Sequence, residues 1–433
     1  MTPRRFILGF ATSRYLRRLY PSFSHRPAYN MTSHGIARSS TTPRSAKARE
    51  ADLLKIKEYN TLVSEVQDLK SSNTYTQATL SKTSLLLSQN PEFNTIWNYR
   101  RRIILHLLSS IPSPTPANPP QDTTESTEED EKRVEKEKSS LISSELQYLL
   151  PLLQSYPKCY WIWNYRIFLL QTASAQLSHP TALKVWKAEM GLVNKMLSRD
   201  ARNFHGWGYR RFVVSNVEKL LTTSTDTTPV DESTKTVSGV SKSMKEEEEE
   251  GLSMVESEFA YTSEMYKKSL SNFSAWHNRS KLIPRLLNER NATMEERRTF
   301  LDGELATMQE AIFTDPYDQS IHLYNLHLIT STCSPLESVR VSDIVDLIPP
   351  QKFMILLETT KWMKELLEEE PECRLLLESL ISVGQLMLGV LAEGGLDVDG
   401  GEIRQDLREW LDKLMEVDPM RMGRWKELAG TLE

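Results

Sequence analysis

Hydrophobic residues recur along most of the chain at the spacing of an α-helix. One set of five would share a single helical face: Leu183, Trp186, Met190, Val193 and Leu197. The same spacing occurs in residues 301–312 and in residues 141–152, where Glu145 is the one polar member of the apolar face. We find no run of alternating apolar and polar residues long enough to indicate a sheet. The pattern therefore predicts an all-α fold.

Five short blocks of sequence resemble one another. They cover residues 91–108, 157–171, 201–215, 270–287 and 316–330. Four of them contain Trp-x-x-Arg: Trp97 and Arg100, Trp163 and Arg166, Trp207 and Arg210, Trp276 and Arg279. The fifth block has His322 and Asn325 at these positions. Four copies in register are hard to obtain by chance, so the chain is a repeat protein.

The spacing of the blocks predicts the architecture. The Trp residues are 66, 44 and 69 positions apart. Removing about thirty inserted residues from each long interval leaves a period of roughly 35–45 residues, which is typical of solenoids of helical hairpins. Each block follows an amphipathic segment and a short turn, so its Trp would lie in the first turns of the second helix. We predict an alpha-alpha superhelix in which each Trp fills the groove of its hairpin. Each Arg would cap or bridge carbonyls of the neighbouring hairpin.

Composition divides the chain into segments. Residues 1–49 contain nine Arg, one Lys and no acidic residue before position 50, and we predict a basic disordered segment. Its first 30 residues read as a mitochondrial transit peptide, as untranslated sequence before Met31, or as an incidental basic tail. Residues 50–330 would form the solenoid, with disordered inserts at 109–139 and 222–251, which are charged or lack aromatic residues. Residues 331–433 read as a C-terminal helical extension.

Charge and cysteine content exclude several classes of protein. The formal net charge of -5 argues against nucleic acid as the main partner. No apolar run approaches the ~20 residues of a membrane helix, so we predict no membrane span. Cys159, Cys333 and Cys373 stand far apart, which excludes a disulfide scaffold and a cysteine-rich zinc site. This usage fits a reducing compartment, and we expect a cytoplasmic protein.

The repeated Asn-x-x-x-Trp-x-x-Arg block resembles the repeat of protein prenyltransferase alpha subunits over about residues 50–330. Within that family, residues 199–214, 272–284 and 313–320 are similar to the third, fourth and fifth blocks of the alpha subunit of Rab geranylgeranyltransferase, the type II enzyme. Residues 416–421 (EVDPMR) are similar to its C-terminal tail, and residues 31–35 to its start. The alpha subunit shared by protein farnesyltransferase and geranylgeranyltransferase type I is the alternative, but it lacks the VDPMR segment.

The resemblance implies an enzyme that works as a heterodimer. The chain would wrap a separate beta subunit, and that subunit would carry the catalytic zinc, so no cofactor or metal site is expected in this chain. The substrates would be geranylgeranyl diphosphate and the C-terminal cysteines of Rab GTPases, presented by a Rab escort protein. A non-enzymatic helical-repeat scaffold is the rival of a different class.

The same resemblance implies three catalytic residues. Lys158 and Tyr160 precede Trp163, and His205 precedes Trp207, at positions where the family faces the diphosphate and the target cysteine. Phe204 stands where the farnesyl enzyme has a tyrosine, so any hydroxyl role is lost there. From residue types alone, a lysine in the position of Lys158 is most often solvated, and a histidine such as His205 is most often a satisfied interface residue.

Overall fold

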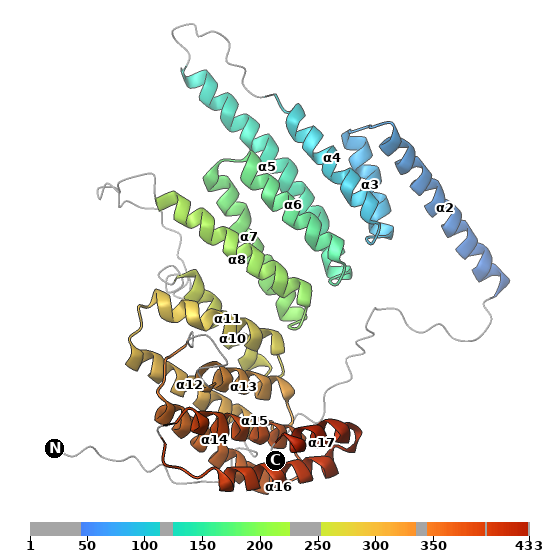
Figure 1. Ribbon diagram of the computed structural model, residues 1–433. Helices are drawn as coiled ribbons and strands as arrows, with labels where there is room; N and C mark the ends of the chain where they lie inside the picture. The colour runs from blue at the N-terminus through green and yellow to red at the C-terminus, as the bar shows by residue number, and fades with distance from the viewer. Residues whose placement is uncertain (1–44, 113–123, 226–252, 335–343, 395, 432–433) are drawn as a thin grey trace. The chain divides into compact units, whose positions relative to one another are not determined.

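A computed structural model describes residues 45–112, 124–225, 253–334, 344–394 and 396–431. Every regular element in these ranges is a helix, which confirms the all-α prediction (Figure 1). The contacts divide the chain into two units, and the described helices of one lie in Ala37–Val240 and those of the other in Ser241–Glu433. The basic segment 1–44 and most of the insert 222–251 lie outside the described residues.

The unit in Ala37–Val240 consists of one leading helix and three helical hairpins. The helices are α2 (Ala46–Ser71), α3 (Gln77–Gln89), α4 (Asn94–Ser110), α5 (Thr124–Ser155), α6 (Tyr160–Gln176), α7 (His179–Arg199) and α8 (Phe204–Thr225). The hairpins are α3–α4, α5–α6 and α7–α8, and α2 packs on α3. The second helix of a hairpin, which we call the B helix, packs on the B helix of the next hairpin, α4 on α6 and α6 on α8.

The unit in Ser241–Glu433 repeats this arrangement. Its helices are α10 (Met254–Lys268), α11 (Phe273–Glu289), α12 (Met294–Thr314), α13 (Gln319–Cys333), α14 (Pro349–Glu369), α15 (Arg374–Ala392), α16 (Gly401–Val417), the 3-10 turn η1 (Pro419–Arg421) and α17 (Met422–Gly430). The B helices α11, α13 and α15 pack on one another in order, and α16 covers α15. Each unit is thus a stack of antiparallel hairpins, as the repeat period predicts.

The sixth hairpin, α14–α15, has the repeat geometry without the repeat signature. Its B helix carries Leu377 where the others carry Trp or His. Cys373, four positions before Leu377, shows that α15 is equivalent to the other B helices. Its thiol donates to the Pro316 carbonyl of the preceding hairpin at 3.1 Å. Cys159 makes the same contact with the Pro91 carbonyl at 3.4 Å. The segment predicted only as a helical extension therefore contains another repeat.

The prediction that residues 109–139 form a disordered insert is wrong for its second half, because α5 begins at Thr124. The segment is rich in Glu and Lys, which favour helices as well as solvation, and its one apolar residue, Val134, is only 8% exposed. Glu135 anchors this part of the helix by accepting from the Ser178 backbone N–H at 3.0 Å. The basic segment likewise ends early, since α2 already begins at Ala46.

One described helix is long and apolar enough to span a membrane, although the sequence analysis found no such segment. Arg374–Ala392 in α15 is 19 residues long, with a mean hydropathy of 1.9, so its length and composition would allow a membrane span. However, 56% of the apolar 18-residue stretch of this helix is buried. The helix packs against α13, α14 and α16. This is the environment of a core helix.

Candidate functional site

Four of the hairpins share an indole that is bonded to the turn of its own hairpin. Each Trp donates its N–H to the carbonyl six residues upstream: Trp97 to Pro91 at 2.8 Å, Trp163 to Pro157 at 2.9 Å, Trp207 to Ala201 at 2.9 Å and Trp276 to Leu270 at 2.7 Å. All four side chains are buried. The bond gives a carbonyl of the turn a hydrogen-bond donor, and it satisfies the N–H of a buried indole. The Trp therefore fixes where the B helix begins relative to its turn.

His322 preserves this bond in the fifth hairpin. Its Nε2 lies 2.9 Å from the Pro316 carbonyl and its Nδ1 lies 2.9 Å from the Ser379 hydroxyl. A carbonyl can only accept, so Nε2 carries the proton and Nδ1 accepts from Ser379. His322 is thus an internal replacement for Trp that also ties α13 to α15. It does not end the array, because α14 and α15 follow.

We expect His322 to make stability depend on pH. Burial lowers the pKa of its imidazole below the ordinary value of 6.5, so the unfolded chain takes up a proton at higher pH than the folded chain. Stability should therefore be lost as the pH falls through about 6.5, by at most ~1.4 kcal/mol per pH unit. Urea midpoints between pH 7.5 and 5.5 measure this. His322→Gln, which can keep both hydrogen bonds, should show a shallower decline, and an unchanged decline would refute the assignment.

Three of the four repeat arginines make a buried, bidentate ion pair with a glutamate of the next hairpin. Arg100 Nε and Nη2 both donate to Glu145 at 2.7 Å, and Arg166 donates to Glu189 at 3.0 and 2.5 Å. In the other unit, Arg279 pairs with Glu304 at 2.8 and 2.5 Å. The arginines were predicted to bridge carbonyls of the neighbouring hairpin, and this is wrong in one respect. The neighbour supplies a carboxylate, whereas the bonded carbonyl belongs to the arginine's own hairpin.

That carbonyl lies twenty residues before the arginine in each of these three repeats. Arg100 Nη1 donates to the Leu80 carbonyl and Arg166 Nη1 to the Leu146 carbonyl, both at 2.9 Å. Arg279 Nη1 reaches the Phe259 carbonyl at 3.4 Å. Arg210, the remaining repeat arginine, donates from Nη1 to the side chain of Asn194 in its own hairpin. The guanidinium therefore binds the first helix of its own hairpin as well as the next hairpin.

A buried tyrosine completes each pair. Tyr165 donates to Glu145 at 2.9 Å, Tyr209 to Glu189 at 2.6 Å and Tyr324 to Glu304 at 2.7 Å. Burial, and then the carboxylate beside each ring, raise the pKa of all three phenols well above the ordinary value, so they remain protonated donors. The glutamate and tyrosine come from one hairpin and the arginine from the hairpin before it. This triad sets the register in which hairpins stack.

The triad is lost as a unit at the junction of the fifth and sixth hairpins. Asn325 replaces the arginine. Thr359 replaces the glutamate, because it stands eighteen residues before Leu377 just as Glu145 stands eighteen residues before Trp163. Both are buried. A buried charge without its partner is costly, whereas losing both charges together is tolerated. We therefore expect the two positions to depend on each other.

The three predicted catalytic residues lie at the starts of two neighbouring B helices in one unit. Lys158 is exposed in the turn before α6, and Tyr160, the first residue of α6, is 52% exposed. His205 is half-buried in the first turn of α8, with its ring centroid 6.3 Å from that of Tyr160. The structure thus brings Tyr160 and His205 together, with Lys158 two residues before Tyr160.

One further cation stands at this end of the hairpins. Arg202 is exposed and precedes Trp207 by five residues, as Lys158 precedes Trp163. Sequence analysis missed it, although the alignment of the two blocks would have shown it. Phe204 beside it is 77% exposed. Cations, a phenol and helix N-termini together can stabilise an anion, and the exposed rings can contact an apolar chain.

The cysteines show no sign of reactivity. Burial raises the pKa of the Cys159 and Cys333 thiols to about 11, and it also raises that of Cys373. Thiols of this kind stay protonated and are poor nucleophiles. Within the described ranges, no group of three or more His, Cys, Asp or Glu could hold a metal ion.

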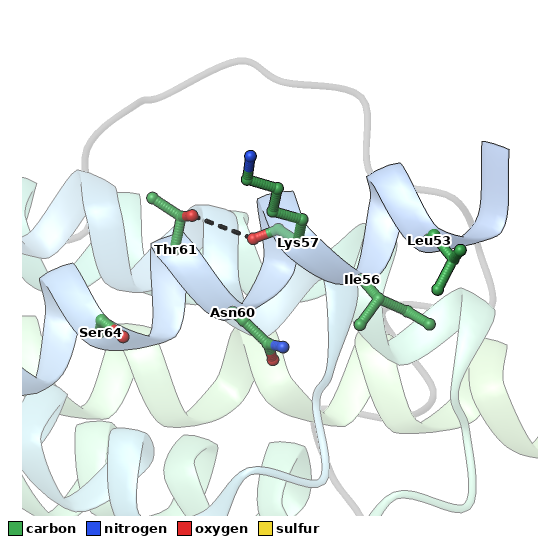
Figure 2. Close-up of a pocket in the computed structure, with 6 residues that line it drawn as sticks. All are labelled: Leu53, Ile56, Lys57, Asn60, Thr61 and Ser64. Carbon is green, nitrogen blue, oxygen red and sulfur yellow. Dashed lines mark hydrogen bonds between the residues drawn. The ribbon is translucent and has the colours of Figure 1, made fainter. Parts of the chain in front are cut away.

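A hollow on the surface lies apart from these residues. It runs along α2 and is lined by side chains of that helix alone: Leu53, Ile56, Lys57, Asn60, Thr61 and Ser64 (Figure 2). The one hydrogen bond drawn there is local, from the Thr61 hydroxyl to the Lys57 carbonyl at 3.0 Å. A hollow formed by a single helix, without converging polar groups, lacks the features of a catalytic site.

Comparisons with known proteins identify the repeat. The protein prenyltransferase alpha subunit repeat matches residues 77–107, 142–173, 186–217 and 255–286. A solved structure of Candida albicans protein geranylgeranyltransferase-I is similar over 87% of this chain and 91% of its own, with a TM-score of 0.51 and 18% identity. That likeness shows the shared fold. With the stacked hairpins described above, it confirms the predicted alpha-alpha superhelix.

Relatives in sequence specify the group. The geranylgeranyl transferase type-2 subunit alpha of Saccharomyces cerevisiae is 33% identical over 67% of this chain and 70% of its own length. Those of Candida albicans and Schizosaccharomyces pombe are 30% and 31% identical, covering 92% and 91% of this chain and 98% and 97% of theirs. By its repeats, its fold and these relatives, the chain belongs to the protein prenyltransferase alpha-subunit family, within the group of the geranylgeranyl transferase type-2 alpha subunits.

Proposed function

We propose that this chain is the alpha subunit of a type-2 geranylgeranyl transferase and is active only with a beta subunit. The observation that carries the proposal is the match to type-2 alpha subunits over nearly their whole length. The enzyme would transfer the geranylgeranyl group of geranylgeranyl diphosphate to C-terminal cysteines of Rab GTPases. The beta subunit would bind the zinc, an escort protein would present the Rab, and the reaction would take place in the cytoplasm.

The contribution of this chain would be electrostatic. In the transfer, the cysteine sulfur forms a bond to C1 of the isoprenoid while the C1–O bond breaks, and the electron pair leaves with the diphosphate. Negative charge grows on the leaving oxygen, and donors already aimed at it lower the barrier. The Lys158 ammonium, the Tyr160 hydroxyl and the His205 ring lie at one end of adjacent B helices, where helix N-termini add positive potential.

Reconstitution tests the proposal. The chain would be co-expressed with the beta subunit and supplied with escort protein, a Rab and either labelled geranylgeranyl or farnesyl diphosphate. We expect geranylgeranyl to be incorporated into the Rab by the heterodimer, and no transfer by the chain alone. Transfer of farnesyl to a CaaX peptide would indicate the alternative, a subunit shared by the farnesyl and type I enzymes. A stable monomer that binds no beta subunit would indicate a scaffold.

A further inference from the structure

A chain of hydrogen bonds connects α4 to the hydroxyl of Tyr160. Arg101 Nη2 donates to Asn164 Oδ1 at 2.5 Å, and Asn164 Nδ2 donates to the Tyr160 hydroxyl oxygen at 3.2 Å. Arg101 lies on α4, whereas Asn164 and Tyr160 lie on α6, four residues apart and so on one face of that helix. The guanidinium therefore acts on Tyr160 from the preceding hairpin.

The chemistry of these groups fixes the direction of each bond. A guanidinium has donors only, so the atom of Asn164 that faces Arg101 must be the carbonyl oxygen. The amide nitrogen of Asn164 then faces Tyr160, and the phenol oxygen accepts. Because that oxygen is occupied as an acceptor, the hydroxyl proton is left to point away from Asn164. Tyr160 is 52% exposed and its ring centroid lies 6.3 Å from that of His205, so the hydroxyl can donate that proton to a ligand near His205.

Arg101 is itself held in place. Its Nη1 donates to Asn98 Oδ1 at 2.5 Å, and its guanidinium carbon lies 5.5 Å from the centroid of the Phe168 ring and 5.9 Å from that of Tyr165. Burial lowers the pKa of Arg101, while the nearby phenols of Tyr165 and Tyr160 act to raise it. An arginine nevertheless remains charged at neutral pH. It differs from Arg100, whose charge is neutralised by Glu145.

We infer that Arg101 is a positioning residue for Tyr160. Through Asn164 it orients the phenol as a donor, ready to bond the diphosphate oxygen on which charge develops. The inference rests on the proposed function and extends it to a residue that sequence analysis did not select. The neighbouring Arg102 provides a control, because it is exposed and, among the described residues, no hydrogen bond joins it to Asn164 or Tyr160.

A double-mutant cycle in the reconstituted heterodimer tests the inference. Single-turnover transfer of geranylgeranyl would be measured for the wild type, Arg101→Gln, Tyr160→Phe and the double variant, with Arg102→Gln as control. We expect Arg101→Gln and Tyr160→Phe each to lower the rate about tenfold, the loss of one directed hydrogen bond of ~1.4 kcal/mol. The double variant should be no slower than Tyr160→Phe, since Arg101 would act only through that hydroxyl.

The outcomes separate this inference from the proposed function. If the effects multiply to about a hundredfold, Arg101 acts independently of Tyr160 and the inference is wrong while the enzyme assignment stands. The same holds if Arg101→Gln transfers at the wild-type rate, or if Arg102→Gln is equally slow. If Tyr160→Phe transfers normally, Tyr160 has no role and Arg101 cannot position it. If the wild-type heterodimer transfers nothing, both the function and the inference fail.

Discussion

Replacing Arg166 by asparagine should lower the free energy of unfolding by about 3–5 kcal/mol, since it leaves the buried carboxylate of Glu189 without its cation. Arg166 and Glu189 are both almost fully buried, at 2% and 4% exposed. The substitution also removes the bond from Arg166 to the Leu146 carbonyl. Urea denaturation followed by helical circular dichroism measures the loss.

The chain itself supplies the compensating change. Combining Arg166→Asn with Glu189→Thr reproduces the pair Asn325 and Thr359 found at the last junction. Since replacing both members of a buried ion pair costs far less than removing one, the double variant should recover most of the lost stability. The coupling energy should be at least ~2 kcal/mol. Additive losses in the double variant would show that the paired replacement reflects no dependence between the positions.

Replacing Lys158 by alanine should slow single-turnover transfer about a hundredfold, or ~3 kcal/mol, because an ammonium aimed at developing charge in a dehydrated site is worth that much. The melting temperature and heterodimer yield should stay near the wild-type values, since Lys158 is exposed in a turn. Lys187→Ala, which removes an exposed lysine of α7, is the control. A normal transfer rate in Lys158→Ala would mean that this lysine is only solvated.

The sequence was informative where the determinant of structure is local. Trp97, Trp163, Trp207 and Trp276 each bond a carbonyl six residues away, so the motif that marks a hairpin is contained within it. Helix α15 was not recognised as a repeat because Leu377 replaces the Trp. Its equivalence depends on the contact from Cys373 to Pro316, 57 residues earlier.

The triads could not be predicted because their members come from different hairpins. Glu145 was visible as the one polar residue on an apolar helical face, but its partner Arg100 is 45 residues away. Only stacking brings them together. The same holds for the candidate site, where Arg101 reaches Asn164 over 63 residues. A polar residue on an apolar face, recurring eighteen residues before each Trp, is the signal that could have revealed the glutamates.

The most direct test of the account is the composition of the native complex. The tagged chain would be purified from its own cells, and its intact mass and zinc content determined by native mass spectrometry. We predict a 1:1 heterodimer with a prenyltransferase beta subunit and one zinc ion per complex, since the repeats and the relatives of this chain are those of prenyltransferase alpha subunits. A chain purified alone as a monomer, or in a stoichiometric complex without a beta subunit, would contradict it.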